Sequence, residues 1–357
     1  MRSKSILALA LSVLWVGLSG TVWAQKYSGG TGEPNNPYRI ATPNDLNDIG
    51  NHIEDFNKCF VMVNDINLVD YTGTQFNIIG SSYPDSFTGV FDGSGHRILN
   101  FNYETNSGNN VGLFASVSSY GVDCQIKNLA FENPNVRAFT SNHVGVLAGY
   151  NSGKISDCLV TGGVVYGNHS VGGLVGSSQG TLSRVYASVL VNGDLFVGGL
   201  AGEVIFASIY DSYSAGTCMG GDAIGGLAGF VNGPEVLNCY SVTVVDGNTA
   251  VGSLTGLSHG TAYHECFVDE LVNPDVNAVG EWLGQDPNVH AKNTVQMQQR
   301  STFTDAGWDF VEVWGIGQGQ TYPFLRVYPG GDLNHDGIVN MLDFAIAALG
   351  WLEGTEE

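Results

Sequence analysis

The sequence predicts an all-β fold, a right-handed parallel β-helix with coils of about 27 residues. One observation is a phased motif, which reads VGLFA at 111, VGVLAG at 144, VGGLVG at 171, VGGLAG at 197, IGGLAG at 224 and VGSLTG at 251. A second is its spacing, which is 27, 26, 27 and 27 residues from 144 onward. A third is that short apolar runs alternate with glycine-rich turns, without helical periodicity.

Residues one coil apart form columns of similar chemistry, as stacked parallel strands about 4.8 Å apart require. The columns are Ile155, Leu182, Ile209 and Val236; Cys158, Val185, Ser212, Cys239 and Cys266; Leu159, Tyr186, Tyr213, Tyr240 and Phe267; and Val164, Val191, Cys218, Val245 and Val272. Neighbouring side chains of a strand face opposite sides. We therefore expect the column of Cys158 inside and that of Leu159 outside or at a corner. A leucine-rich horseshoe is the alternative, but each of its repeats needs a helical turn.

The first 24 residues have the form of a secretory signal peptide. Arg2 and Lys4 precede an apolar run too short to span a bilayer, and Ala24 ends a cleavage site. Without these two cations, 11 basic and 34 acidic residues leave a net charge of −23. We expect a secreted or cell-surface protein that has no membrane span after cleavage and does not bind nucleic acid.

Residues 25–110 are expected to form an N-terminal cap and the first coils, before the repeats of 111–279. Thr42 is placed to cap a helix that begins with Pro43 and has Asp45 at its third position. The apolar face predicted for this helix comprises Leu46, Ile49, Ile53 and Phe56. The run CFVMV at 59–63 predicts the first clear strand.

Residues 280–328 lose the repeat and concentrate large apolar side chains. These are Met297, Phe303, Trp308, Phe310, Trp314, Tyr322 and Phe324. We interpret the segment as a hydrophobic plug on the last coil. Stacking of these rings on a sugar is the alternative.

A charged column runs beside the cysteine column. Its members are Asp157, Arg184, Asp211, Asn238 and Glu265. Asp157, Arg184 and Asp211 are the candidate catalytic residues, because two carboxylates can serve a glycosidase as acid and base. The competing interpretation is a surface ladder in which Arg184 bridges the two acids. The ladder is favoured, because Arg184 would occupy the space that substrate and water need.

Six cysteines in an exported chain raise the question of disulfide bonds. Cys239 and Cys266 lie one coil apart, but in-register side chains leave their Cβ atoms slightly too far apart for a preferred bridge. The sequence therefore favours buried free thiols.

The final segment, 329–357, contains a calcium-loop motif, GDLNHDGIVNMLDFA. Oxygen donors fall at the loop positions that wrap around one Ca²⁺, and glycine stands at position 6. The candidate ligands are Asp332, Asn334, Asp336, the Ile338 carbonyl, Asn340 and Asp343. A short helix from Met341 to about Leu352 is expected to follow the loop.

Two family resemblances rest on these motifs. The motif V/I-G-G-L-x-G, with the later NCYS of 238–241, resembles the GLUG repeat of secreted bacterial proteins over about 111–270. That resemblance implies an extracellular β-helix and does not imply catalysis. The stretches from GTGEPNNPYRI and AGWDFVEVW onward also resemble the start and close of such proteins.

The calcium loop resembles one repeat of a type I dockerin, in which Asp stands at position 12. This resemblance implies attachment to a cohesin-type scaffold or another extracellular protein, commonly for polysaccharide breakdown. The chain has one loop where dockerins carry two, and the apolar Met341 and Leu342 occupy the usual cohesin-contact positions.

The expected function is therefore a non-enzymatic binding or surface-associated protein that is attached through its calcium module. A glycan is a further expected partner. The alternatives are a β-helical polysaccharide hydrolase or lyase tethered by the dockerin-like module, and a structural spacer or adhesin.

Overall fold

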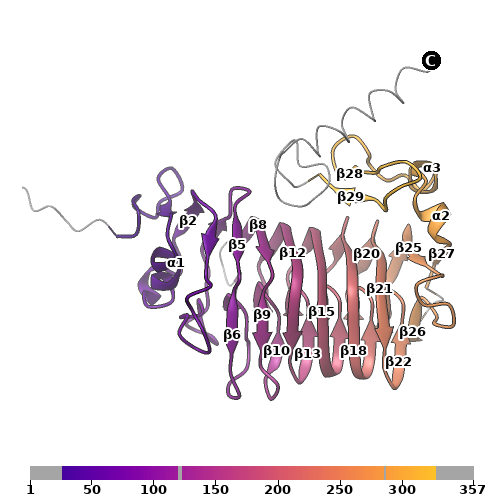
Figure 1. The fold of residues 1–357 in the computed structure, drawn as a ribbon, viewed down its shortest axis with the longest axis horizontal. Coiled ribbons are helices and arrows are strands. Elements are labelled where there is room, and N and C mark those ends of the chain that lie inside the picture. Colours follow the sequence, from indigo (N-terminus) through magenta and orange to yellow (C-terminus); the bar gives the residue numbers. More distant parts are fainter. Residues whose placement is uncertain (1–25, 120–122, 285–286, 327–357) are drawn as a thin grey trace, which may run out of the picture.

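The computed structural model describes residues 26–119, 123–284 and 287–326. Over these residues the chain is a right-handed parallel β-helix, and its coils stand side by side along the long axis (Figure 1). The described strands form a 20-stranded, a seven-stranded and a two-stranded sheet. The fold class that the repeat predicts is confirmed. No helix within the described ranges is long and apolar enough to cross a membrane.

The 20-stranded sheet wraps around most of each coil, and its strands pair in parallel with those of neighbouring coils. They are β1 (Tyr38–Ile40), β2 (Cys59–Met62), β3 (Ile66–Asn67), β4 (Val90–Asp92), β5 (Arg97–Leu99), β6 (Asn102–Glu104), β8 (Gln125–Glu132), β9 (Asn135–Arg137), β10 (Asn142–Val144), β12 (Lys154–Tyr166), β13 (His169–Gly172), β15 (Leu182–Gly198), β17 (Ile209–Tyr210), β18 (Tyr213–Gly225), β20 (Glu235–Leu237), β21 (Tyr240–Asp246), β22 (Thr249–Gly252), β24 (Ala262–His264), β25 (Cys266–Asp269) and β27 (Val289–Lys292).

The seven-stranded sheet forms a separate face of the coils, in the order β26, β23, β19, β16, β14, β11, β7. Its strands are β7 (Phe114–Val117), β11 (Ala148–Asn151), β14 (Val175–Ser178), β16 (Ala201–Ile205), β19 (Ala228–Asn232), β23 (Thr255–His259) and β26 (Val279–Leu283). β26 and β27 extend the solenoid beyond residue 279, where the sequence repeat stops.

The repeated motif marks the corner that leads into the seven-stranded sheet. In the copy at 224, the preceding Ala223 has a left-handed φ of 55°. The motif leucine, Leu227, is fully buried. A Cβ at the last motif glycine, Gly229, would lie 2.4 Å from the carbonyl carbon of Phe196 in the preceding coil. Glycine is needed there because two backbones pass too closely to admit a side chain.

The N-terminal end carries the predicted helix, α1 (Pro43–Ile49), beside the first coil (Figure 1). Thr42 and Asp45 form a capping box, and Leu46 and Ile49 are buried. The prediction for Ile53 was wrong, because its side chain is 57% exposed. The helix ends at Ile49, so Ile53 lies in the short 3-10 turn η1 (Ile53–Asp55) and does not belong to the apolar face of the helix.

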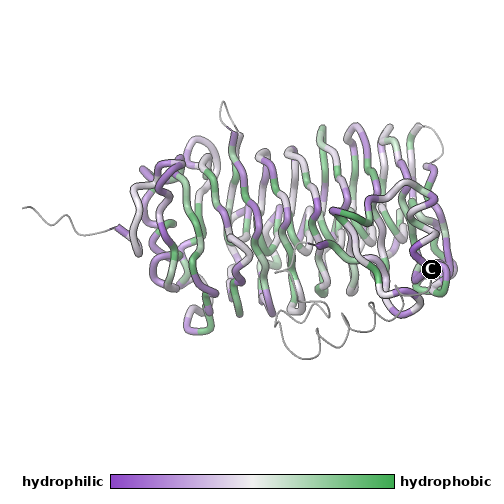
Figure 2. The backbone as a smooth tube through the Cα atoms, turned by 90° about the horizontal axis from the view of Figure 1, so that it is seen from above, coloured by the Kyte–Doolittle hydropathy of each residue, from purple (hydrophilic) through white to green (hydrophobic). Residues whose placement is uncertain are grey.

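The inward and outward columns follow the predicted alternation, and polar and apolar stretches alternate around the coils (Figure 2). The column of Cys158 is completely buried. Cys158 Sγ–H donates to the Ser156 carbonyl at 3.2 Å, and Ser212 Oγ–H donates to the Tyr210 carbonyl at 2.6 Å. A short side chain with a donor therefore satisfies a carbonyl group at the corner.

One predicted column was wrong at both ends. Val165, and not Val164, pairs with Val191, because the register shifts between Thr161 and Val164. Two glycines with left-handed φ values lie within this irregularity, at 162 and 163. At the other end, Val272 follows β25 in a turn and belongs to no strand.

The C-terminal segment lies along the side of the solenoid, at the upper right in Figure 1. It contains α2 (Thr294–Met297), α3 (Arg300–Thr304) and the antiparallel pair β28 (Trp314–Gly315) and β29 (Phe324–Leu325). The expectation of a plug over the last coil is therefore corrected. The segment covers the outward aromatic column, because Tyr213, Tyr240 and Phe267 share one buried cluster with Trp308 and Trp314.

Polar contacts hold this segment on the aromatic column. The Asp269 side chain is buried and accepts hydrogen bonds from Tyr322 Oη and Thr294 Oγ1, both at 2.7 Å to Oδ2. Trp308 Nε1 donates to the Glu265 carbonyl at 3.0 Å. The rings that the sequence predicts as a plug thus bury the outer face of several coils.

Candidate functional site

The charged column lies at a corner of the coils where the backbone is left-handed. The φ values are 55° at Asp157, 50° at Arg184 and 47° at Asp211, and the column continues through Asn238 and Glu265. Left-handed backbone is costly for most residues and is tolerated best by glycine, asparagine and aspartate. Among the three candidates, Arg184 is therefore the residue least suited to this conformation.

The pairings along the column show how the side chains are used. Arg184 Nε and Nη2 donate to Asp157 Oδ1 and Oδ2 at 2.6 and 2.7 Å. Asn238 Nδ2 donates to Asp211 Oδ1 at 3.1 Å. The structure thus brings the three candidate catalytic residues into one column, but the prediction that Arg184 bridges the two acids was wrong. Arg184 is bonded to Asp157, and Asp211 accepts its hydrogen bond from Asn238. The arrangement suits charge neutralisation between coils.

The six candidate calcium ligands, Asp332, Asn334, Asp336, Ile338, Asn340 and Asp343, lie outside the described residues. The same holds for the predicted signal peptide, residues 1–24.

Polar and aromatic side chains line two depressions on a different face. It is the outer side of the seven-stranded sheet, where the side chain after the last motif glycine points away from the core. This outer column is Tyr150, Ser177, Glu203, Phe230, Leu257 and Glu281. The left-handed residue before each motif lies beside it, as Asn110, His143, Ser170, Phe196, Ala223 and Ala250. We call this surface the sheet face.

A depression of about 570 Å³ opens on the sheet face over β7 and β11 and extends to Gln179, which directly follows β14. Each of its ten lining residues has a hydroxyl, amide or aromatic side chain. They are Ser82, Tyr83, Ser86, Asn110, Ser116, Ser118, His143, Tyr150, Ser152 and Gln179. None is Asp, Glu, Lys or Arg. The Tyr83 side chain stands at the edge with 74% of its surface exposed.

His143 is part of this lining. Its Nδ1 lies 2.8 Å from Asn110 Oδ1, which accepts the hydrogen bond, and its Nε2 lies 3.6 Å from Glu203 Oε1. Burial lowers the pKa of His143, although the charge of Glu203 opposes this effect. The imidazole is therefore neutral at pH 7, and the depression has no charged lining there.

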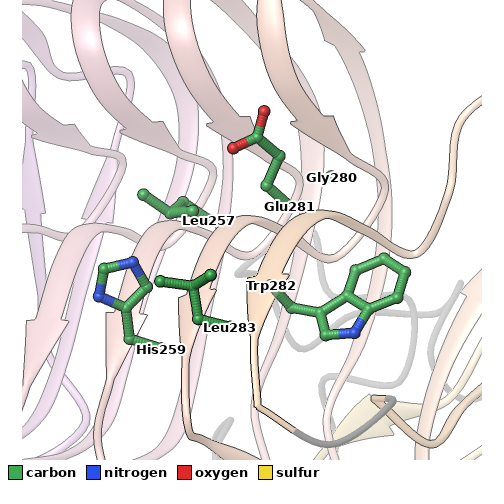
Figure 3. A pocket seen from close by; sticks show the side chains of 6 residues that line it. All are labelled: Leu257, His259, Gly280, Glu281, Trp282 and Leu283. Atoms are coloured by element: carbon green, nitrogen blue, oxygen red, sulfur yellow. The ribbon is translucent and has the colours of Figure 1, made fainter.

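Aromatic rings continue along the sheet face beyond the depression. Phe196 stacks on Phe230 at a centroid distance of 5.1 Å, and Phe230 meets His259 edge-on at 5.0 Å. A second depression follows at the end of the sheet, lined by Leu257, His259, Gly280, Glu281, Trp282 and Leu283. In Figure 3 the Trp282 indole points away from Leu257 and His259.

Sequence reasoning missed this face because its residues do not share a chemical type. The loop of 81–86 contributes Tyr83 from outside the repeat, and the aromatic Tyr150 and Phe230 are separated in their column by Ser177 and Glu203. One signal was present. The residues directly before and directly after each V-G-G-L-x-G motif recur at the repeat spacing, and these two columns make up the sheet face.

Comparison with known proteins supports the repeat architecture, and no protein-family model matches the chain. Over 155 residues, 42% of this chain, it is 33% identical to Halomucin of Haloquadratum walsbyi. Over 138 residues, 38% of this chain, it is 30% identical to a protein of Evansella cellulosilytica described as "Putative Gly-rich membrane protein". The matches span only 2% and 15% of those relatives.

A solved structure shares the fold. It is described as the crystal structure of a "putative immunoglobulin A1 protease from Bacteroides ovatus" and superposes with a TM-score of 0.66. The match covers 85% of this chain and 96% of that chain, at 19% sequence identity. At this identity the likeness supports the β-helix alone.

Proposed function

We propose that the chain is an extracellular binding protein that does not turn over its ligand. In this proposal the β-helix presents the sheet face to a ligand, and the calcium loop attaches the protein to a partner. The observation that carries it is the depression on the sheet face, whose ten lining residues include no Asp, Glu, Lys or Arg. Such a lining can hold a ligand by hydrogen bonds and ring contacts, and its one imidazole, His143, is already engaged by Asn110 and lies beside Glu203.

The charged corner is compatible with this view. Asp157 accepts two hydrogen bonds from Arg184, one on each carboxylate oxygen, so a fixed cation occupies one side of the carboxylate. A general acid or base needs a free path to the reacting atom.

The attachment half of the proposal rests on the donor set of the tail. Five side chains and the Ile338 carbonyl supply oxygen, the ligand that Ca²⁺ prefers, at the spacing of a calcium loop. Bound calcium would supply the charge that orders this acidic loop. A GLUG-like solenoid with a dockerin-like tail fits attachment to a cohesin-type scaffold or another extracellular protein, within a polysaccharide-degrading system.

The test measures calcium and partner binding by the full chain. Calorimetry is expected to give one Ca²⁺ per chain, and Asp332→Ala and Asp336→Ala are expected to abolish that binding. Retention of the chain on immobilised type I cohesin, or on washed cells of the producing organism, is expected in calcium and lost in EDTA. Retention that EDTA and both variants leave unchanged would overturn the attachment.

The same preparation tests the absence of turnover. Incubation with polysaccharides is expected to release no new reducing ends. Release that Asp157→Ala and Asp211→Ala abolish would establish a hydrolase or lyase at the charged corner instead.

A further inference from the structure

Two depressions and a line of rings follow one another along the sheet face. The first depression extends from β7 over β11 to the end of β14, and the second lies on β23 and β26. Phe196 and Phe230 occupy the coils between them. The sheet orders its seven strands from β7 to β26, so the face extends across six spacings of about 4.8 Å, roughly 29 Å. A ligand that uses both depressions must be long and extended.

The chemistry of the lining favours an uncharged ligand. The first depression presents hydroxyl and amide groups, together with an imidazole that is neutral at pH 7. The carboxylates on the sheet face are those of Glu203 and Glu281, on β16 and β26. Glu203 has His143 as its neighbour at 3.6 Å. A polyanion would meet these two carboxylates and a chain of high net negative charge, so repulsion disfavours it.

The rings give the face a second means of recognition. A sugar has polar edges and apolar C–H faces, so it suits a surface that alternates hydroxyl groups with aromatic rings. Tyr83 and Tyr150 border the hydroxyl-rich depression, and Phe230 with His259 borders the second one. Serine is depleted at protein–protein interfaces, and five of the ten residues that line the first depression are serines, so this lining disfavours a folded protein partner.

From these observations we infer that the sheet face binds a neutral polysaccharide chain, which lies along the solenoid axis from the Tyr83 depression to the Leu257–His259 depression. The inference rests on the proposed binding function and names the ligand of that same face. Each coil contributes one short step of the path, so affinity should grow with the length of the bound chain. A monosaccharide would fill part of one depression and bind weakly.

The experiment measures binding of the full chain to neutral polysaccharides (xylan, mixed-linkage glucan, galactomannan) and to acidic ones (polygalacturonate, alginate), with oligosaccharides of increasing length from the best neutral polymer. Tyr83→Ala removes a ring at the first depression, and Phe230→Ala removes a ring between the two depressions, beside the second one. Phe139→Ala is the matched control, since Phe139 is 48% exposed and contacts Tyr166 away from the sheet face. Circular dichroism and thermal unfolding verify that each variant folds.

We expect affinity for a neutral polymer to rise with chain length. Tyr83→Ala and Phe230→Ala are each expected to weaken the longest ligand roughly tenfold, the effect of losing one ring contact. Phe230→Ala should leave ligands that fit the first depression unaffected, and Phe139→Ala should bind as the unaltered chain does.

Three outcomes would overturn the inference. The first is preferential binding of an acidic polymer. The second is neutral-polymer binding that Tyr83→Ala and Phe230→Ala leave unchanged. The third is that no polysaccharide binds while the calcium-dependent attachment persists, which would retain the attachment and remove the glycan. If the chain binds a neutral polysaccharide but shows no calcium-dependent attachment, the proposed role of the tail is wrong and the inference about the sheet face stands.

Discussion

The guanidinium of Arg184 forms two parallel hydrogen bonds with the carboxylate of Asp157 in the preceding coil, at 2.6 and 2.7 Å. Both residues have left-handed backbone, with φ of 50° and 55°. The pair therefore joins two strained corners across neighbouring coils. Asp157 and Arg184 are two of the three residues that the sequence offers as catalytic candidates.

Arg184→Ala should lower the free energy of unfolding by about 1 kcal/mol, because it removes a bidentate ion pair that is only partly exposed. The alanine would still have to adopt the left-handed φ of residue 184. Arg184→Gly should cost less than Arg184→Ala, since glycine adopts positive φ without strain. Chemical denaturation of both variants measures the difference. Equal losses would show that the backbone strain at this corner is negligible.

The last glycine of a motif copy should tolerate no side chain. In Gly229→Ala the new Cβ would lie 2.4 Å from backbone atoms of Phe196 and Val197, so two coils must move apart. We expect a loss of about 3 kcal/mol or more, or failure to fold. The control is Gly95→Ala, where φ is +80° but no atom lies within 4 Å, and about 1 kcal/mol is expected. Thermal unfolding of the two variants compares a backbone clash with conformational strain alone, and equal losses would contradict the close approach.

The bond from Tyr322 to the buried Asp269 should stabilise the C-terminal segment in a pH-dependent way. Burial, followed by the hydrogen bond to Asp269, raises the pKa of Tyr322 to about 12. A raised folded-state pKa means that the stabilisation is complete below the ordinary tyrosine pKa of about 10 and is lost as the pH rises towards 12. Tyr322→Phe should cost about 2 kcal/mol at pH 8, because a buried carboxylate loses a donor.

Unfolding of the unaltered chain and of Tyr322→Phe between pH 8 and 12 measures this effect. The difference in stability between them should shrink above pH 10. A difference that stays constant to pH 12 would mean that ionisation of Tyr322 does not weaken the attachment of the segment. Thr294→Val is a useful control, since it removes the other hydroxyl donor to Asp269 without adding a titrating group.

The cysteines should remain reduced in the folded protein. All six are free, and five are buried. Burial raises the pKa of Cys124 to about 12 and raises the pKa of Cys158, so the reactive thiolate is disfavoured. A thiol reagent at pH 8 should modify at most the half-buried Cys59 in the native state and all six cysteines in denaturant. Fewer than six reactive thiols in denaturant would indicate a disulfide bond.

Much of the fold could be predicted because equivalent contacts in a solenoid recur in the sequence at one fixed spacing. The column of Ile155 and the column of Cys158 are inside because every coil repeats the same alternation. The capping box at Thr42 could be predicted because it depends on neighbouring residues alone. Local chemistry and a fixed period were enough in both cases.

The errors arose where the period slips or where the chain leaves the repeat. The irregularity at residues 162 and 163 shifts the register and puts Val165 in place of Val164. No periodic signal says where the aromatic C-terminal segment lies, because its contacts with Tyr240 and Phe267 join residues far apart in sequence. The depression on the sheet face combines a loop before the repeats with three coils, so its lining residues are not neighbours in the sequence and do not recur at the repeat spacing.

Hydroxyl-radical footprinting with and without a bound neutral polysaccharide locates the binding surface, because it reports the exposure of individual aromatic side chains. The ligand should protect Tyr83, Tyr150 and Phe230 and leave Phe139 as reactive as before. Protection centred on the corner of Asp157 and Arg184, with Tyr83 and Phe230 unchanged, would show that the polysaccharide does not bind to the sheet face.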